Sequence, residues 1–225
     1  MGDESDLSVT AEAYDDVAER YARMFSGELA RRPLDRALLG AFAELVRSQA
    51  AAAGAPAAVA DLGCGPGHIT AHLHDLGVEA FGVDLSPQMI ALARRDRPGL
   101  RFEVGNMQGL ALAGGALGGI VAWYSIIHTP PERVPALFAE FARLLAPGGQ
   151  LLLGFQAADP GVGVPQWHPH LVTPSHRWPP EAIIALLGRA GFVASARLLR
   201  DPDATERLPS AVLLAHRPAP TAVPT

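Results

Sequence analysis

Cysteine is nearly absent from this chain, because Cys64 is the only one among its 225 residues. A lone cysteine cannot form a disulfide within the chain, and the N-terminus lacks the basic and apolar regions of a signal peptide. These two absences predict a reducing, cytoplasmic setting. No apolar run reaches the roughly 18 residues that a membrane span needs, so we expect a soluble protein without a membrane partner.

Positive charge is also scarce. The chain has 18 Lys and Arg against 23 Asp and Glu, a formal net charge of −5, and it contains no lysine- or arginine-rich block. A protein that binds a nucleic-acid backbone needs a basic surface, so the composition argues against a nucleic-acid partner. Hydrophobic residues make up 49% and charged residues 18%, which excludes a largely disordered chain.

Strand and helix patterns alternate along most of the sequence. Two helices are expected first, at residues 10–25 and 34–53. Short apolar strands are then expected at 57–62, 79–84, 100–104, 119–124 and 150–155, with helices between them at 69–76, 87–97 and 131–146. A helix at 180–190 and two strands, at 192–199 and 210–216, complete the pattern. Strands that alternate with helices predict an α/β fold with a parallel, doubly wound, Rossmann-like sheet.

The most informative segment is Val59-Ala-Asp-Leu-Gly-Cys-Gly-Pro-Gly-His68, where an apolar strand ends at an acidic residue and opens into three glycines. A strand that turns into a helix within a few residues needs positive φ or close backbone approach, which glycine allows at low cost. The loop is therefore typical of a nucleotide cradle. His68 stands where a dinucleotide fingerprint has its third glycine, which argues against NAD or FAD.

A second acidic residue follows the next expected strand. Asp84 lies about 20 residues after Gly63, the interval at which a carboxylate reaches the ribose hydroxyls of a nucleoside ligand. Its two oxygens can accept from both hydroxyls. The alternative is that Asp84 only helps to cap the helix that follows Ser86.

Asp61-Leu-Gly-Cys-Gly-Pro-Gly67 resembles motif I of the class I S-adenosylmethionine-dependent methyltransferases. Two later segments, Ala122-Trp-Tyr-Ser-Ile-Ile-His128 and Leu144-Leu-Ala-Pro-Gly-Gly-Gln-Leu-Leu-Leu153, look like the end of strand four and the junction before strand five in the small-molecule methyltransferases. The resemblance spans about residues 10–217. It implies a seven-stranded sheet with an antiparallel seventh strand, S-adenosyl-L-methionine as cofactor with S-adenosyl-L-homocysteine as product, and a small-molecule acceptor.

The resemblance also implies a set of cofactor-binding residues. Asp61 is expected to orient the ammonium group of the methionine moiety or, alternatively, the amides of its own loop. Asn106 stands where relatives usually carry an aspartate that accepts from the adenine amino group, and its alternative role is to stabilise a turn. Gly118-Gly119 lacks a second acid that relatives often have. The expected set is Tyr14, Tyr21, Asp61, Gly63, Cys64, Gly65, Gly67, Asp84, Leu85, Asn106, Met107, Trp123 and Tyr124.

We expect one domain over residues 1–225, in which residues 10–56 resemble the helical lid of relatives and residues 57–217 form the core. Tyr14 and Tyr21 are seven residues apart, hence on one helix face, which suits a lid and plain packing equally. Residues 218–225 are expected to be disordered.

Methyl transfer demands alignment of the acceptor and exclusion of water, and a hydroxyl acceptor benefits from a nearby base. His128 lies four residues beyond Tyr124, past the end of a strand that leads to the cleft. We therefore expect His128 to act as a base or to orient the acceptor, which favours O-methylation over N- or C-methylation. The alternative is a structural role.

Residues 157–178 interrupt the alternation with prolines, tryptophans and histidines, and loops this long are often functional. We expect this insertion to form a wall of the acceptor pocket, and the alternative is a proline-stiffened connector. No carboxylate or cysteine accompanies its histidines at a ligand spacing, so no metal site is expected. The expected substrate-side residues are Trp167, His168, His170, His176, Arg177 and Trp178.

Two other functions stay open. One is methylation of a protein or an RNA, although no basic patch and no Asn-Pro-Pro-Tyr-type motif support it. The other is a non-catalytic subunit or sensor that binds S-adenosylmethionine, which the missing acids at positions 106 and 119 allow. The residues specify neither the acceptor nor the oligomeric state, monomer or homodimer.

Overall fold

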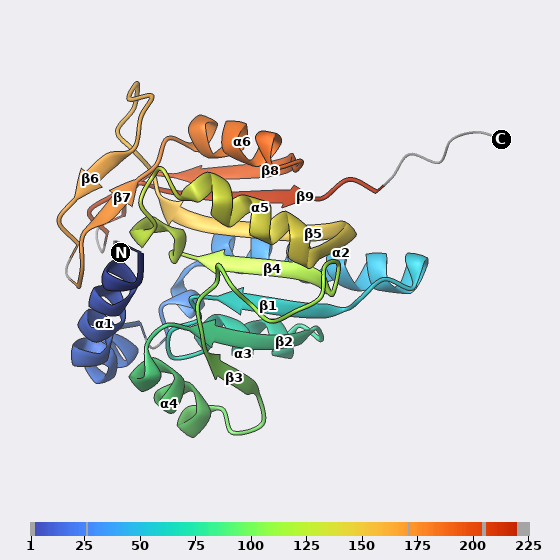
Figure 1. The fold of residues 1–225 in the computed structure, drawn as a ribbon, viewed down its shortest axis with the longest axis horizontal. Coiled ribbons are helices and arrows are strands. Elements are labelled where there is room, and N and C mark those ends of the chain that lie inside the picture. The colour runs from blue at the N-terminus through green and yellow to red at the C-terminus, as the bar shows by residue number, and fades with distance from the viewer. Residues whose placement is uncertain (1–2, 26, 171, 204–205, 220–225) are drawn as a thin grey trace.

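The computed structural model describes residues 3–25, 27–170, 172–203 and 206–219. A seven-stranded sheet forms its centre, with strand order β3-β2-β1-β4-β5-β9-β8 (Figure 1). Parallel pairing joins β1 (Ala58–Leu62), β2 (Glu79–Asp84), β3 (Arg101–Val104), β4 (Leu117–Trp123) and β5 (Leu145–Gln156). β9 (Ser210–His216) runs antiparallel to β5 and to β8 (Val193–Arg200). The predicted Rossmann-like sheet with an antiparallel seventh strand is confirmed.

Helices cover both faces of the sheet (Figure 1). α5 (Val134–Leu144) and α6 (Pro180–Arg189) pack on one face in an apolar cluster, and α2 (Pro33–Ala53) and α3 (His68–Asp75) pack on the other. Consecutive strand residues point to opposite faces. Ile120 accordingly belongs to the first cluster and Val121 to the second. The remaining helices are α1 (Asp3–Phe25) and α4 (Pro87–Asp96), with one-turn segments η1 (Leu29–Arg31) and η2 (Ile126–His128).

Some boundaries differ from the sequence prediction. α1 begins before residue 10, and β5 begins at Leu145 although the proline and glycines at 147–149 predict a helix end there. Leu145 pairs with Leu117, and the amide of Gly148 donates to the carbonyl of Arg217 at 2.7 Å. Hydrogen bonds to neighbouring segments therefore keep this stretch extended in spite of its turn-forming residues.

The insertion at 157–178 contains a small hairpin that the sequence did not predict. β6 (Gln166–His168) and β7 (Ser175–Arg177) form a two-stranded antiparallel sheet in which Trp167 lies opposite His176. Strands of three residues between prolines are too short to leave an alternating pattern. Of the expected tail, residues 220–225 lie outside the described residues.

The structure explains the missing acid at positions 118 and 119. A Cβ atom on Gly118 would lie 2.0 Å from the carbonyl oxygen of Pro56, and one on Gly119 would lie 2.7 Å from the Cζ atom of Phe42. The segment before β1 thus packs on the backbone of Gly118 and α2 packs on that of Gly119, so a side chain at either position would collide with its neighbour. In the part of the chain that the structure describes, no helix is long and apolar enough to cross a membrane.

Gly119→Ala should lower the free energy of unfolding by about 1–3 kcal/mol, because its methyl group overpacks the contact between α2 and β4. Chemical denaturation monitored by circular dichroism measures this change. The matched control is Gly114→Ala, whose Cβ would lie 3.4 Å from its nearest neighbour, the carbonyl oxygen of Arg143. Equal stability of the two variants would contradict the account.

Candidate active site

A cavity lies at the carboxyl ends of β1 to β4, the edge at which open parallel sheets bind ligands. It encloses about 960 Å³ of empty space, part of it open to solvent, and α1 forms its outer wall. The expected site residues that line it are Tyr14, Tyr21, Gly63, Gly65, Asp84, Leu85, Asn106, Met107, Trp123, Tyr124 and His128. Wall residues that the sequence analysis did not single out are Leu7, Thr10, Ala11, Ser86, Met89, Gly105, Gln108, Ser125, Thr129, Pro130 and Arg133.

The glycine loop needs its glycines for two separate reasons. Gly63 and Gly65 have φ values of 77° and 52°, in the left-handed region that only glycine adopts readily. A Cβ on Gly63 would also lie 2.3 Å from the Cβ of Ser125, whose hydroxyl donates to the carbonyl of Leu62 at 2.6 Å. A Cβ on Gly65 would meet nothing within 4 Å. The loop therefore offers bare backbone to the cavity at Gly65.

Two other expected loop residues lie away from the cavity wall. Cys64 is buried in an apolar cluster with Phe102, and burial raises the pKa of its thiol well above the usual value. Gly67 is the N-cap residue immediately before α3, and a Cβ there would lie 2.6 Å from the Phe102 ring. Both residues support the loop on the side that faces away from the cavity.

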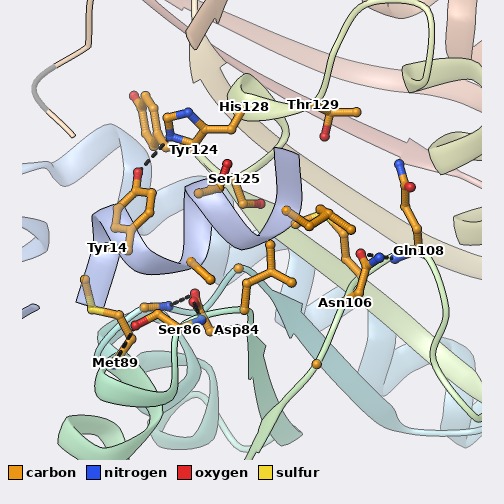
Figure 2. A pocket seen from close by; sticks show the side chains of 18 of the residues that line it. Tyr14, Asp84, Ser86, Met89, Asn106, Gln108, Tyr124, Ser125, His128 and Thr129 are labelled. Carbon is orange, nitrogen blue, oxygen red and sulfur yellow. Dashed lines mark hydrogen bonds between the residues drawn. The ribbon is translucent and has the colours of Figure 1, made fainter. Parts of the chain in front are cut away.

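The carboxylate of Asp84 lies at the end of β2 beside Ser86 (Figure 2). One oxygen accepts from the amide of Ser86 at 2.9 Å, and the other accepts from the amide of Gly65 at 2.8 Å. Burial raises the pKa of Asp84, and these two amide bonds oppose the rise. Because each carboxylate oxygen accepts more than one hydrogen bond, the turn-stabilising role and a ribose-binding role are compatible.

Asp61 lies under the glycine loop and is completely buried. One of its oxygens accepts from the hydroxyl of Thr70 at 2.6 Å, and the other has no hydrogen-bond partner among the described residues. Burial raises the pKa of Asp61 to about 7. An unpartnered, buried carboxylate oxygen is costly, and a cation close to the loop would offset that cost.

Asn106 follows β3 and accepts from the amide of Gln108 through its side-chain oxygen at 3.0 Å (Figure 2). This bond stabilises a local turn, which was the alternative role predicted for Asn106. The oxygen retains a second lone pair for a ligand. Met107 also lines the cavity and packs against the larger apolar cluster.

Tyr124, just beyond β4, is the one non-glycine residue with positive φ in the described part of the chain, at 55°. Its amide donates to the carbonyl of Gly154 at 2.8 Å, and its ring lies 5.7 Å from that of Trp123 in an edge-on arrangement. Backbone strain of this kind concentrates at functional sites, where the surrounding structure maintains it.

α1 lies over the cavity because it is held against α4. The carboxylate of Asp15 accepts from the hydroxyl of Ser86 and from the amide of Gln88, so it completes the N-terminus of α4. Ala18 packs against Met89 in a small apolar cluster below this contact.

His128 connects three parts of the molecule. The hydroxyl of Tyr14 lies 2.7 Å from Nε2 of His128 (Figure 2), and Nδ1 lies 3.0 Å from the carbonyl oxygen of Pro174 in the insertion. A carbonyl oxygen only accepts, so Nδ1 carries the proton and Nε2 accepts from Tyr14. Burial lowers the pKa of His128 to about 4. The ring is therefore neutral, with both nitrogens occupied.

The substrate-side residues expected in the insertion do not lie on the cavity wall. Trp167 is 63% exposed, Trp178 is buried, and Arg177 pairs with Asp159. His170 approaches the wall, with its ring centroid 5.3 Å from that of His128. His168 and His176 lie in the hairpin. Among the described residues, no group of three His, Cys, Asp or Glu side chains is arranged to hold a metal ion.

We predict that the His128 ring stays neutral, in the Nδ1-protonated form, at pH values down to about 5, because its pKa lies near 4. Long-range ¹H–¹⁵N correlation spectra across a pH titration measure both the tautomer and the pKa. Tyr14→Phe removes the donor to Nε2 and should shift the Nε2 resonance. A titration midpoint near 6.5 or a proton on Nε2 would contradict the assignment.

Comparison with known proteins agrees with this geometry. Residues 59–149 match the methyltransferase domain family. The malonyl-[acyl-carrier protein] O-methyltransferase of Enterobacter lignolyticus is 33% identical over 103 residues, which cover 46% of this chain and 40% of the relative. The trans-aconitate 2-methyltransferase of Methylobacterium nodulans is 37% identical over 125 residues, or 55% of this chain and 43% of the relative. The alignments thus span less than half of the length of these curated relatives.

A solved structure extends the likeness to nearly the whole fold. The Burkholderia thailandensis 1,6-didemethyltoxoflavin-N1-methyltransferase, with 1,6-didemethyltoxoflavin and S-adenosylhomocysteine bound, superimposes with a TM-score of 0.70 at 21% identity, covering 94% of this chain and 88% of that one. The strand order and the antiparallel β9 define a methyltransferase fold. Together with the matched segment, they make the chain similar to methyltransferases in its fold and over residues 59–149.

Proposed function

We propose that this protein transfers a methyl group from S-adenosylmethionine to an oxygen atom of a small-molecule acceptor. The observation that carries the proposal is one cavity that has the bare glycine loop and Asp84 at one part of its wall and the Tyr14–His128 pair at another. When bound, S-adenosylmethionine supplies a methyl group on a sulfonium. The match of residues 59–149 to the methyltransferase domain family and the names of the curated relatives support this activity.

The residues of the cavity fit this cofactor. Asp84 is positioned for the ribose hydroxyls, Asn106 and Met107 for the adenine, and the loop from Gly63 to Gly65 for the methionine moiety. The charge of Asp61 behind the loop favours the ammonium group of that moiety. Four aromatic residues, Tyr14, Tyr21, Trp123 and Tyr124, line the same cavity.

In this proposal His128 positions α1 beside the acceptor and does not act as the acceptor's base. A base must have a free lone pair directed at the acceptor proton, and the Nε2 lone pair of His128 is directed at Tyr14. The lowered pKa of His128 also makes it a weak base. The pair instead holds α1 against the core and excludes water from the methyl group.

Oxygen as the methylated atom is supported by the O-methyltransferase name of one relative, whereas the structural relative is named for methylation at nitrogen.

Incubation with S-adenosylmethionine and a metabolite panel, followed by mass spectrometry, tests the proposal. We expect acceptor-dependent release of S-adenosylhomocysteine. His128→Asn should lower turnover by more than it weakens binding of S-adenosylhomocysteine. Binding without any turnover would favour a non-catalytic sensor.

Gly65→Ala should weaken S-adenosylhomocysteine binding by about tenfold or more, because its methyl group intrudes where the cofactor approaches the loop backbone. Isothermal titration calorimetry measures this loss. Gly161→Ala is the matched control, since Gly161 also has positive φ and open space around it but lies in the exposed insertion. Both variants carry the same backbone strain, so equal affinities would show that Gly65 does not face the cofactor.

A further inference from the structure

Ser86 connects the ribose end of the cavity to α1. Its amide donates to one oxygen of Asp84 at 2.9 Å, and its hydroxyl donates to the carboxylate of Asp15 on α1. The same hydroxyl accepts from the amide of Met89 at 3.0 Å and so caps α4 (Figure 2). Ser86 is completely buried and lines the cavity. One serine therefore holds both the carboxylate expected to bind the ribose and the carboxylate that anchors α1.

The two carboxylates that Ser86 holds repel each other. Burial raises the pKa of Asp84, and the charge of Asp15 adds to that rise. The amides of Ser86 and Gly65 donate to Asp84 and favour its ionised form. Docking of α1 thus brings one negative charge toward another that is already buried. While the ribose site is empty, this docking carries an electrostatic cost.

A bound ribose reduces that cost. Each oxygen of Asp84 accepts an amide hydrogen bond and has capacity for another. Two ribose hydroxyls that donate to these oxygens stabilise the ionised carboxylate and disperse its charge. Asp15 then meets less repulsion, while its own bonds to the hydroxyl of Ser86 and the amide of Gln88 stay the same. The occupied site therefore favours docked α1 more than the empty site does.

We propose that Asp15 is a positioning residue that couples the docking of α1 to occupancy of the ribose site. This inference rests on the proposed methyltransferase function and names a regulation of the same cavity. A ligand that donates to Asp84 strengthens the docking of α1, and docked α1 strengthens the binding of that ligand by the same factor, because coupling between two sites is reciprocal. α1 also supplies Leu7 and Tyr14 to the wall, so an occupied ribose site favours the closed form of the whole cavity.

Isothermal titration calorimetry tests the coupling with two ligands, S-adenosylhomocysteine and its analogue that lacks both ribose hydroxyls. Loss of the hydroxyls should weaken binding to the wild-type protein. Asp15→Asn keeps an oxygen for Ser86 and Gln88 but removes the charge, so the hydroxyls have less repulsion to relieve. We expect the ratio of the two dissociation constants to be about fivefold smaller in Asp15→Asn than in the wild type, at the lower end of couplings between sites.

Glu19→Gln is the matched control. Glu19 lies one turn along α1 from Asp15, and its exposed carboxylate pairs with Arg95 of α4. This variant also removes a negative charge from the contact between the two helices, but it should leave the ratio of the dissociation constants unchanged. A merely structural role for Asp15 would alter the stability of α1 and leave that ratio as it is in the wild type.

Hydrogen exchange gives a second measurement, on the wild-type protein. At saturation, S-adenosylhomocysteine should slow exchange of the α1 amides more than the analogue without hydroxyls does. Both ligands contact the same wall, so the difference between them reports the part of the docking that depends on Asp84. This comparison needs no substitution, and it decides the inference if Asp15→Asn does not fold.

The remaining outcomes separate the inference from the proposed function. A ratio in Asp15→Asn that equals or exceeds the wild-type ratio overturns the inference, and so does an equal fall in Glu19→Gln. Equal protection of α1 by the two ligands also overturns it. If the wild-type protein binds both ligands equally, the hydroxyls do not reach Asp84, and the inference fails while the proposed function stands. Failure of S-adenosylhomocysteine itself to bind overturns the proposed function.

Discussion

The hydrogen bond between Tyr14 and His128 is the interaction on which the candidate site depends. It closes α1 over the carboxyl ends of the strands, and the bond from Nδ1 to Pro174 brings the insertion to the same imidazole. The two bonds fix one tautomer and occupy both ring nitrogens. A closed cavity and an occupied histidine therefore have a common cause.

Contacts of unequal strength hold α1 in place. The ion pair between Glu19 and Arg95 is exposed on both sides, and such pairs contribute little. Asp15 contributes more, because it completes an otherwise open helix N-terminus and lies above the apolar contact between Ala18 and Met89. α1 is thus held by a few polar contacts over a small apolar base.

The sequence predicted those features of the fold and site that depend on short local patterns. The glycine loop, Asp84 and the sheet follow from spacing within short segments, and nearly all of the expected cofactor residues reach the cavity. Contacts between residues that are far apart in the sequence could not be predicted. Arg133 and Asp15 look like ordinary surface residues of helices, and only the arrangement of α5 and α1 brings them to the site. For the histidines of the insertion, composition does not say which side of a hairpin faces a cavity, and in the structure His170 lies beside the His128 ring.

The Tyr14–His128 bond also joins residues 114 positions apart, and the bond from Pro174 adds a partner still further along the chain. Closing a loop of this length carries an entropic cost that the contact must offset. Local opening of a folded protein begins where few contacts hold a segment. The cavity can therefore open by a local motion of α1 while the hydrogen-bonded sheet stays intact.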